Sequence, residues 1–244
     1  MAWDLSRIRI VLVEPRIPEN IGMSARAMKN CGLSRLVLVN PADHLSAAAC
    51  RPAMEAYPLV QSAEVHRDLA AAIGASRMVV GVTRRGGQDR EPLLTPARWI
   101  QDVLPRAQGQ EISILFGTEK DGLDREAVDR CDVLVTLPAH PDYASFNLAQ
   151  AVLLVCYELF RASAEAPAGS AALQLAAEKE REQLFTHLEA LLLRVGFLHE
   201  NNPGRIMSSL RRLFGRAGLE ERDIRILRGI LSQIEWALER EPRR

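Results

Sequence analysis

Five short apolar segments, separated by helical stretches, constrain the fold of this 244-residue chain more than any other feature. They are built almost entirely from Val, Ile and Leu, and they span residues 8–14, 35–40, 78–83, 112–117 and 133–137. Continuous apolar runs of this length are typical of strands that are buried on both faces of a parallel sheet. The pattern predicts an open α/β domain over residues 1–162.

Two helices of this domain have sequence signals at their ends. The first is predicted over residues 20–31, with Asn20 as its N-cap and Gly32 just past its end. The second is predicted over residues 148–161. Its first ten residues, 148–157, are apolar on all sides, which favours a helix covered on more than one face. Such a helix suits either a dimer interface or the core of a monomer.

The last third of the chain has a different organisation. Residues 163–172 are mostly small, as is typical of a linker. Beyond them, helices are predicted over residues 173–195, 202–214 and 221–239. The sequence therefore predicts a small all-helical domain over residues 173–244. A bundle this thin is expected to dock on another surface.

Composition excludes several classes of protein. Lys plus Arg and Asp plus Glu each number 31, so the chain is not a basic protein that coats nucleic acid by bulk charge. Four cysteines without a C-x-x-C pair predict reduced thiols rather than a disulfide framework or a zinc site, and no metal is expected. The first residues read as a short charged lead into a strand, not as a signal peptide. No apolar run is long enough to span a bilayer, so we predict a cytoplasmic protein that does not contact membranes.

The first candidate motif runs from residue 18 to residue 26. Asn20 and Gly22 lie where the chain leaves the first strand and enters a helix, and Arg26 follows within that helix. A capped helix with one solvated arginine would also explain this segment.

The second candidate motif directly follows a predicted strand. Gly117 and Gly122 bracket Glu119 at the carboxyl end of that strand, where ligands of open α/β sheets bind. The spacing matches neither a P-loop nor the dinucleotide fingerprint, so neither ATP nor a dinucleotide is expected. An ordinary strand-to-helix turn would also explain the glycines.

The third candidate motif spans residues 137–149 and leads into the second helix. Ser145 and Asn147 lie at the predicted helix start, where free backbone N–H groups favour polar partners. A helix cap explains one of these two residues but not both. His140, in the same loop, is either a general base or a bystander.

Together the three motifs resemble those of the SPOUT methyltransferases, in the branch that methylates the ribose 2′-hydroxyl of RNA. The pattern N-x-G-x-x-A-R matches Asn20 to Arg26, F-G-x-E-x-x-G-L matches Phe116 to Leu123, and S-x-N-L matches Ser145 to Leu148. The resemblance implies a trefoil-knotted parallel α/β fold, an S-adenosylmethionine cofactor and a homodimer.

The resemblance also implies roles for individual residues. Arg26 would anchor a substrate phosphate and stabilise the developing alkoxide, because an arginine is almost never neutral enough to act as a free base. Asn20, Ser145 and Asn147 complete the implied catalytic set. The residues implied to contact the cofactor are Val82, Thr83, Arg84, Gly117, Glu119, Leu137, Ala144, Ser145 and Phe146. Many relatives carry Ser at the position of Ala144, so only a backbone contact is carried over there.

The helical tail resembles the C-terminal extension of one branch of this family, which methylates cytidine or uridine at position 32 of tRNA. Residues 201–216 contain four arginines and no acid, and a second basic cluster lies beside the implied cofactor loop. Phosphate contacts of this kind carry affinity for RNA. The predicted RNA-binding residues are Arg84, Arg85, Arg205, Arg211, Arg212 and Arg216. A solvated helix face would also explain the tail arginines. Two alternatives stay open: methylation of another tRNA or rRNA position, and a non-catalytic RNA-binding module.

Overall fold

A six-stranded parallel sheet forms the centre of the larger domain. The computed structural model describes residues 4–84, 93–107, 109–165, 174–199 and 203–240. The strand order is β3-β2-β1-β5-β4-β6, and every neighbouring pair is parallel. The strands are β1 (Ile8–Val13), β2 (Arg35–Val39), β3 (Glu64–His66), β4 (Met78–Val82), β5 (Ile112–Phe116) and β6 (Val133–Val135). The five predicted strands are confirmed to within two residues at each end. The edge strand β3 was missed because it has three residues and lacks an apolar run.

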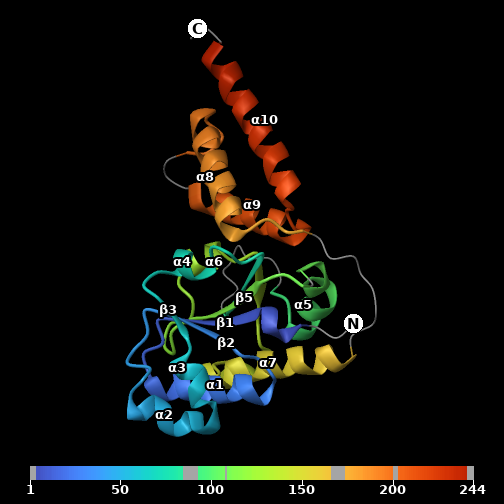
Figure 1. Cartoon of the computed structure of the whole chain (residues 1–244). Helices are drawn as coiled ribbons and strands as arrows, with labels where there is room; N and C mark the ends of the chain where they lie inside the picture. Colours follow the sequence, from blue (N-terminus) through green and yellow to red (C-terminus); the bar gives the residue numbers. More distant parts are fainter. Residues whose placement is uncertain (1–3, 85–92, 108, 166–173, 200–202, 241–244) are drawn as a thin grey trace.

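Helices cover both faces of the sheet (Figure 1). On one face lie α1 (Pro18–Asn30), α2 (Ala47–Ala53), α3 (Tyr57–Gln61), α5 (Pro96–Asp102) and α7 (Leu148–Glu165). On the other lie the short helices α4 (Leu69–Ile73) and α6 (Arg125–Asp129). Alternate residues of β1 enter two separate clusters, Ile10 and Leu12 on the α1 side and Val11 on the α4 side. This double burial is why the strands read as continuous apolar runs.

The prediction of Asn20 as an N-cap is wrong. Helix α1 begins at Pro18, with Ile17 as an N-cap that offers no side-chain bond. Proline suits the first turn because its missing N–H would lack a helical partner there. Asn20 therefore lies inside the first turn, and its side chain is buried. Gly32 does follow the end of α1, with a φ of +76°.

Helix α7 is longer than predicted and has two distinct apolar faces. It continues to Glu165, so residues 163–165 of the predicted linker are helical. One face packs Val152, Val155 and Leu159 into the core. The other face leaves large apolar side chains exposed, namely Leu153, Leu154, Tyr157 and Phe160. The sequence of α7 is therefore apolar around the whole helix, although the rest of the chain covers only one of its two apolar faces.

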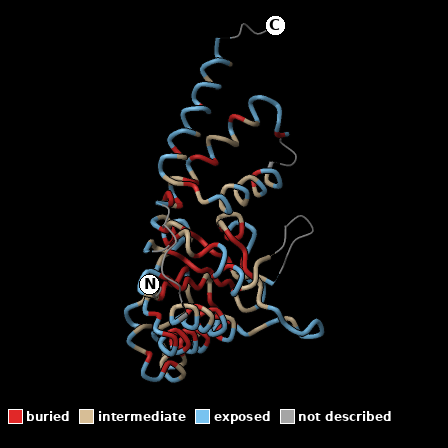
Figure 2. The backbone as a smooth tube through the Cα atoms, turned by 90° about the vertical axis from the view of Figure 1, so that its right-hand side faces the viewer, coloured by how far each residue is buried: buried red, intermediate tan, exposed pale blue. Residues whose placement is uncertain are grey.

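Three helices form the tail, which we define as residues 174–240. They are α8 (Glu178–Arg194), α9 (Pro203–Ala217) and α10 (Glu221–Arg240), each close to its predicted range except that α8 begins five residues later. Helix α10 packs against α8, and α9 closes the bundle next to the larger domain (Figure 1). Most of α10 is exposed (Figure 2).

The tail docks on the amino-terminal edge of the sheet. Arg181 of α8 is 5% exposed, forms an ion pair with Asp132 just before β6, and donates to the carbonyl of Arg77 just before β4. Glu178 pairs with Arg130 in the same region, at 3.2 Å. The helix α9 approaches so closely that a Cβ on Gly215 would lie 2.7 Å from the carbonyl oxygen of Asp132. The expected docking of the tail is thus observed within the chain.

Buried ions also occupy the rest of this amino-terminal edge. Arg9 of β1 is 3% exposed and bonds to Glu64 at 2.5 Å and to Glu111 at 3.4 Å. Arg35 of β2 binds the same two carboxylates. These pairs join four strands, or the residues just before them, into one charged layer.

Candidate functional site

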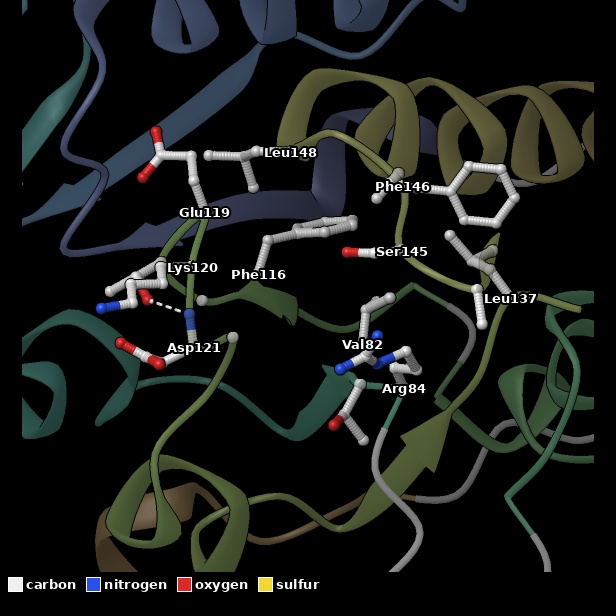
Figure 3. A pocket seen from close by; sticks show the side chains of 16 residues that line it. Val82, Arg84, Phe116, Glu119, Lys120, Asp121, Leu137, Ser145, Phe146 and Leu148 are labelled. Carbon is white, nitrogen blue, oxygen red and sulfur yellow. Dashed lines mark hydrogen bonds between the residues drawn. The ribbon is translucent and has the colours of Figure 1, made fainter. Parts of the chain in front are cut away.

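A pocket lies at the opposite, carboxyl-terminal edge of the sheet, where three chain segments converge (Figure 3). It has a volume of about 750 Å³, counting the solvent at its open mouth. Its walls come from the end of β4, the loop after β5, and the loop that joins β6 to α7. All nine residues implied to contact a cofactor line this one pocket: Val82, Thr83, Arg84, Gly117, Glu119, Leu137, Ala144, Ser145 and Phe146.

The loop after β5 is a tight turn that only glycine permits at two positions. The backbones of Thr118 and Gly122 form two hydrogen bonds, and Gly122 has a φ of +73°. A Cβ on Gly117 would lie 2.0 Å from the carbonyl carbon of Gly122. Gly117 is therefore required by the approach of the loop to itself. The sequence left two explanations open for the glycines, a ligand site and an ordinary turn, and the turn accounts for Gly117.

Glu119 ties two loops together beside the pocket. Its Oε1 accepts hydrogen bonds from the Ile17 N–H at 3.1 Å and the Asn20 Nδ2 at 3.0 Å. Its Oε2 accepts from the Arg16 N–H at 3.0 Å. Burial raises the pKa of Glu119, but these hydrogen bonds outweigh it and hold the pKa below its usual value. The carboxylate is thus ionised and fixed at neutral pH.

Asn20 carries this connection on to the third motif. Because Glu119 accepts from its Nδ2, Asn20 presents Oδ1 to the Nδ2 of Asn147, at 2.8 Å. Asn20 is 2% exposed, so its amide has no water to exchange with. One carboxylate thereby fixes the orientation of two amides from segments 127 residues apart.

Asn147 is also the N-cap of α7. Its Oδ1 accepts from the Ala149 N–H at 2.9 Å and from the Gln150 N–H at 3.4 Å, while Gln150 Oε1 accepts from the Asn147 N–H at 3.1 Å. This reciprocal arrangement is a capping box. The start of α7, and with it the preceding residues Ser145 and Phe146, is therefore held by the same network that fixes Glu119.

The pocket walls combine apolar surface with polar and charged groups. Val82, Phe116 and Leu137 supply apolar surface, while Ser145 lies on the wall that leads into α7 (Figure 3). Arg84 is exposed at the opposite wall. A hollow that offers both apolar surface and hydrogen-bonding groups suits a small organic ligand that has an apolar and a polar part.

Other predicted site residues lie outside the pocket. Arg26 is exposed on α1 and is not among the lining residues. His140 is exposed, and its Nδ1 accepts from the Asp142 N–H within the same turn, Pro141–Tyr143. Arg85 lies outside the described residues.

Several lining residues had no predicted role. Lys120 and Asp121 extend the loop after β5, and the Asp121 N–H donates to Thr118 Oγ1 at 3.1 Å. Leu148 and Ala151, from the first turns of α7, complete the wall. Their position between or next to motif residues was the available signal, but their residue types are too common to single out.

The tail arginines are placed differently from one another. Arg211 is paired with both oxygens of Glu182, and its guanidinium lies 4.7 Å from the ring centre of Phe185. It therefore helps to pack α9 against α8. Arg212 donates to Ser209 Oγ at 3.4 Å, and the carbonyl of Arg216 accepts from Arg106. None of these residues borders the pocket.

Three further predictions concern thiols, metals and membranes. All four cysteines are free, and Cys31, Cys131 and Cys156 are buried. Among the described residues there is no cluster of side chains suited to a metal ion. Within the same residues, no helix has the length and apolar character needed to cross a membrane.

Comparisons with known proteins agree with this geometry. Residues 7–157 match the SpoU rRNA Methylase family, and residues 179–243 match the family described as tRNA methyltransferase TrmJ, C-terminal domain. The tRNA (cytidine/uridine-2′-O-)-methyltransferase TrmJ of Sodalis glossinidius is 37% identical over 95% of this chain and 92% of its own length. The tRNA (cytidine/uridine/adenosine-2′-O-)-methyltransferase TrmJ of Pseudomonas aeruginosa is 36% identical over 95% of both chains. The crystal structure of TrmJ from Z. mobilis ZM4 has a TM-score of 0.77 and 33% identity, covering 93% of this chain and 98% of that one.

Proposed function

Because the chain belongs to the SpoU methylase family and is a full-length relative of the TrmJ methyltransferases, we propose that it methylates the ribose 2′-hydroxyl of nucleotide 32 in tRNA. The fold class predicted from the sequence, a parallel-sheet SPOUT domain followed by a small helical domain, is confirmed. The enzyme is a tRNA 2′-O-methyltransferase that uses S-adenosylmethionine. Cytidine or uridine at position 32 is the finer part of the proposal.

One observation carries the assignment of the site. Residues from the second and third motifs and from the end of β4, far apart in the sequence, line a single pocket at the carboxyl-terminal edge of the sheet, and Asn20 of the first motif bonds to the lining residue Glu119. Ligands of open α/β sheets bind at this edge.

The pocket residues fit the cofactor. Apolar walls from Val82, Phe116 and Leu137 suit a flat base, and the exposed backbone of the loop after β5 offers hydrogen bonds without bulky side chains. The ionised Glu119 carboxylate would favour a cofactor that carries a positive charge. When bound, S-adenosylmethionine supplies an electrophilic methyl group. The protein then has to align the ribose hydroxyl and remove its proton.

Arg26 is proposed to stabilise the oxygen that loses this proton. It lies six residues beyond Asn20 on α1, a rise of about 9 Å along the helix from the network beside the pocket. An exposed guanidinium at that distance can bind an RNA phosphate next to the reacting ribose. Its permanent positive charge would also favour the developing alkoxide.

Asn20 and Asn147 are proposed to orient the site rather than to take part in proton transfer. Their amides are already bonded to Glu119, to each other and to the backbone of α7. Ser145 is directly available at the pocket wall for a ligand or ribose contact. The predicted RNA-binding set of the tail keeps Arg205, Arg212 and Arg216 as candidates, whereas the guanidinium of Arg211 is held by Glu182.

A homodimer is also proposed. The exposed face of α7, with Leu153, Leu154, Tyr157 and Phe160, is a contiguous apolar surface that a second copy would cover. Mass measurement in solution tests this, and Tyr157→Asp with Phe160→Asp should convert the dimer to monomers. A wild-type protein of monomer mass would contradict it. A tRNA-modifying dimer of this kind is predicted to work in the cytoplasm.

The decisive experiment for function is incubation of the enzyme with bulk tRNA and labelled cofactor, followed by mapping of the methylated nucleotide. Label on the ribose of nucleotide 32 supports the proposal. Label at another tRNA position, or on rRNA alone, would replace the substrate but keep the chemistry. Absence of cofactor binding in calorimetry would instead favour a non-catalytic RNA-binding module.

A further inference from the structure

The tail contains a group of arginines whose charge is not neutralised by any residue that the structure describes. On α10, the side chains of Arg222, Arg225 and Arg228 are exposed and have no polar partner among the described residues. Arginines elsewhere in the tail are engaged: Arg181 with Asp132, Arg211 with Glu182, and Arg194 with Glu239. Three arginines without an acidic partner among the described residues therefore lie close together on α10.

Arg222 and Arg225 belong to one continuous helix face, and Arg228 lies beside it. Residues 222, 225, 229, 232, 236 and 240 follow the 3-4 spacing of a single side of an α-helix. This side, which we call the Arg222 face, consists of Arg222, Arg225, Gly229, Ser232, Trp236 and Arg240. It is separate from the side that carries Ile224, Leu231 and Leu238 into the contact with α8.

The acids that border the Arg222 face are directed elsewhere. Glu221 binds Arg77 of the larger domain at 3.1 Å, and Glu239 lies 3.7 Å from Arg194 of α8. The face itself carries no acid. From Arg222 to Arg240 it extends about 27 Å, at the usual rise of ~1.5 Å per residue. It is therefore long enough to follow several consecutive phosphates of a nucleic acid.

Two residues of the Arg222 face have features that contact with a partner outside the chain would explain. Gly229 lies in the middle of an exposed helix, where glycine costs about 1 kcal/mol relative to alanine, and a Cβ there would meet nothing within 4 Å. Trp236 is 47% exposed, with the Arg240 guanidinium 3.9 Å from its ring centre. A bare backbone flanked by arginines allows close approach of a sugar-phosphate chain.

We infer that the Arg222 face of α10 binds the phosphate backbone of the tRNA substrate. This inference rests on the proposed function, because the RNA has to be the substrate of the pocket. It differs from the prediction made for residues 201–216, since it assigns the contact to α10 rather than α9. A second copy of the chain is the other occupant considered, because Ile226 and Ile230 are each 50% exposed beside this face. Two copies meeting through the Arg222 face would bring like charges together, which favours the polyanion.

The test is a tRNA titration of the full-length protein at several salt concentrations. The double variant Arg222→Gln/Arg225→Gln should bind tRNA several-fold more weakly, and the salt dependence should fall by about one unit of slope per lost phosphate contact. The matched control is Arg7→Gln/Arg98→Gln. It removes the same charge from exposed arginines that each face a carboxylate, Asp4 and Asp102, and it should bind like wild type.

A second readout uses Trp236 directly. The chain has two other tryptophans, Trp3 and the fully buried Trp99, so only a change in emission during the titration that disappears in Trp236→Phe reports on the Arg222 face. Cofactor affinity, measured by calorimetry, should be unchanged in every variant.

The outcomes are distinct. Wild-type affinity and salt slope in Arg222→Gln/Arg225→Gln would overturn the inference while leaving the proposed function intact. A wild-type protein that binds no tRNA would overturn both. If Ile226→Ser/Ile230→Ser lowers the mass in solution and weakens tRNA binding as much as the arginine pair does, the surface is a contact between copies and the inference is wrong.

Discussion

The two edges of the central sheet are built from different kinds of interaction. At the carboxyl-terminal edge, the pocket is shaped by glycine backbone, apolar walls and neutral amides that are organised by a single carboxylate, Glu119. At the amino-terminal edge, buried ions predominate, including Arg9 with Glu64 and Arg181 with Asp132. The first edge leaves backbone groups open to a ligand. The second edge uses its polar groups internally.

This difference separates ligand binding from the docking of the tail. Directional hydrogen bonds between Glu119 and the two amides preorganise the surface beside the ligand site. Buried ion pairs, in contrast, are sensitive to the loss of either partner, because the remaining charge is left without compensation. Variants at the two edges should therefore fail in different ways.

The largest expected effect is on methyl transfer, and it tests whether the reaction depends on Arg26 of α1. Arg26→Ala should lower methyl transfer by at least about 100-fold, because it removes the positive charge proposed to stabilise the alkoxide. Cofactor affinity in calorimetry should stay near wild type, since Arg26 does not line the pocket. Arg51→Ala, which removes an exposed arginine from α2, is the control. Near-normal turnover in Arg26→Ala would contradict its assignment.

The next effect is on stability, and it tests the ion pairs at the amino-terminal edge of the sheet. Arg181→Gln should destabilise the docked tail by about 3 kcal/mol, because Asp132 would remain buried without its partner. The measurement is thermal unfolding combined with limited proteolysis of α8. Arg194→Gln, in an exposed pair with Glu239, should change the stability by less than about 1 kcal/mol. Equal effects of the two variants would show that burial of the ion pair is unimportant.

Two glycine-to-alanine substitutions, one in the larger domain and one in the tail, should change the free energy of unfolding in opposite directions. Gly117→Ala should destabilise the larger domain by about 2 kcal/mol and weaken cofactor binding, because the new Cβ meets the backbone of Gly122. Gly229→Ala should stabilise the tail by up to about 1 kcal/mol, because α10 has open space there. Denaturant unfolding measures both changes. The same sign for both would mean that local space does not control the outcome.

The smallest effect concerns pH. Because the pKa of Glu119 is depressed in the folded protein, its stabilising contribution is complete above the usual glutamate pKa of about 4.5 and is lost as the pH falls through the lower folded value. Cofactor affinity should weaken over that acidic range as the bonds to Asn20 and Ile17 are lost. Glu119→Gln should bind more weakly at neutral pH and lose this part of the pH dependence. An unchanged acid limb in the variant would assign the titration to another group.

Sequence patterns predicted the buried parts of the fold better than its edges. The strands read correctly because double-sided burial demands continuous Val, Ile and Leu, whereas β3 has one apolar residue in three and is defined by pairing with β2 alone. The segment 163–165 is helical although its residues are small, since α7 simply continues through them.

For the site, the motifs predicted which residues meet but not how they bond. The nine residues that the resemblance implied as cofactor contacts do line one pocket. The role of Asn20 in orienting Asn147 depends on a tertiary contact, and the sequence pattern wrongly predicted Asn20 to be a local helix cap. Likewise, Arg211 stands in an acid-free segment, but its partner Glu182 comes from another helix. Counting charges along the sequence cannot identify a partner that folding brings close from another helix.

The docking of the tail on the edge opposite the pocket has a consequence for how such enzymes can change. Residues that contact the tail, such as Asp132 and Arg77, share no side-chain partner with the Glu119 network in the described structure, so substitutions in the two regions should contribute independently to the free energy. With RNA binding by the tail, as proposed, selection can therefore alter which RNA is held by remodelling or replacing three helices, while the residues for methyl transfer are inherited unchanged.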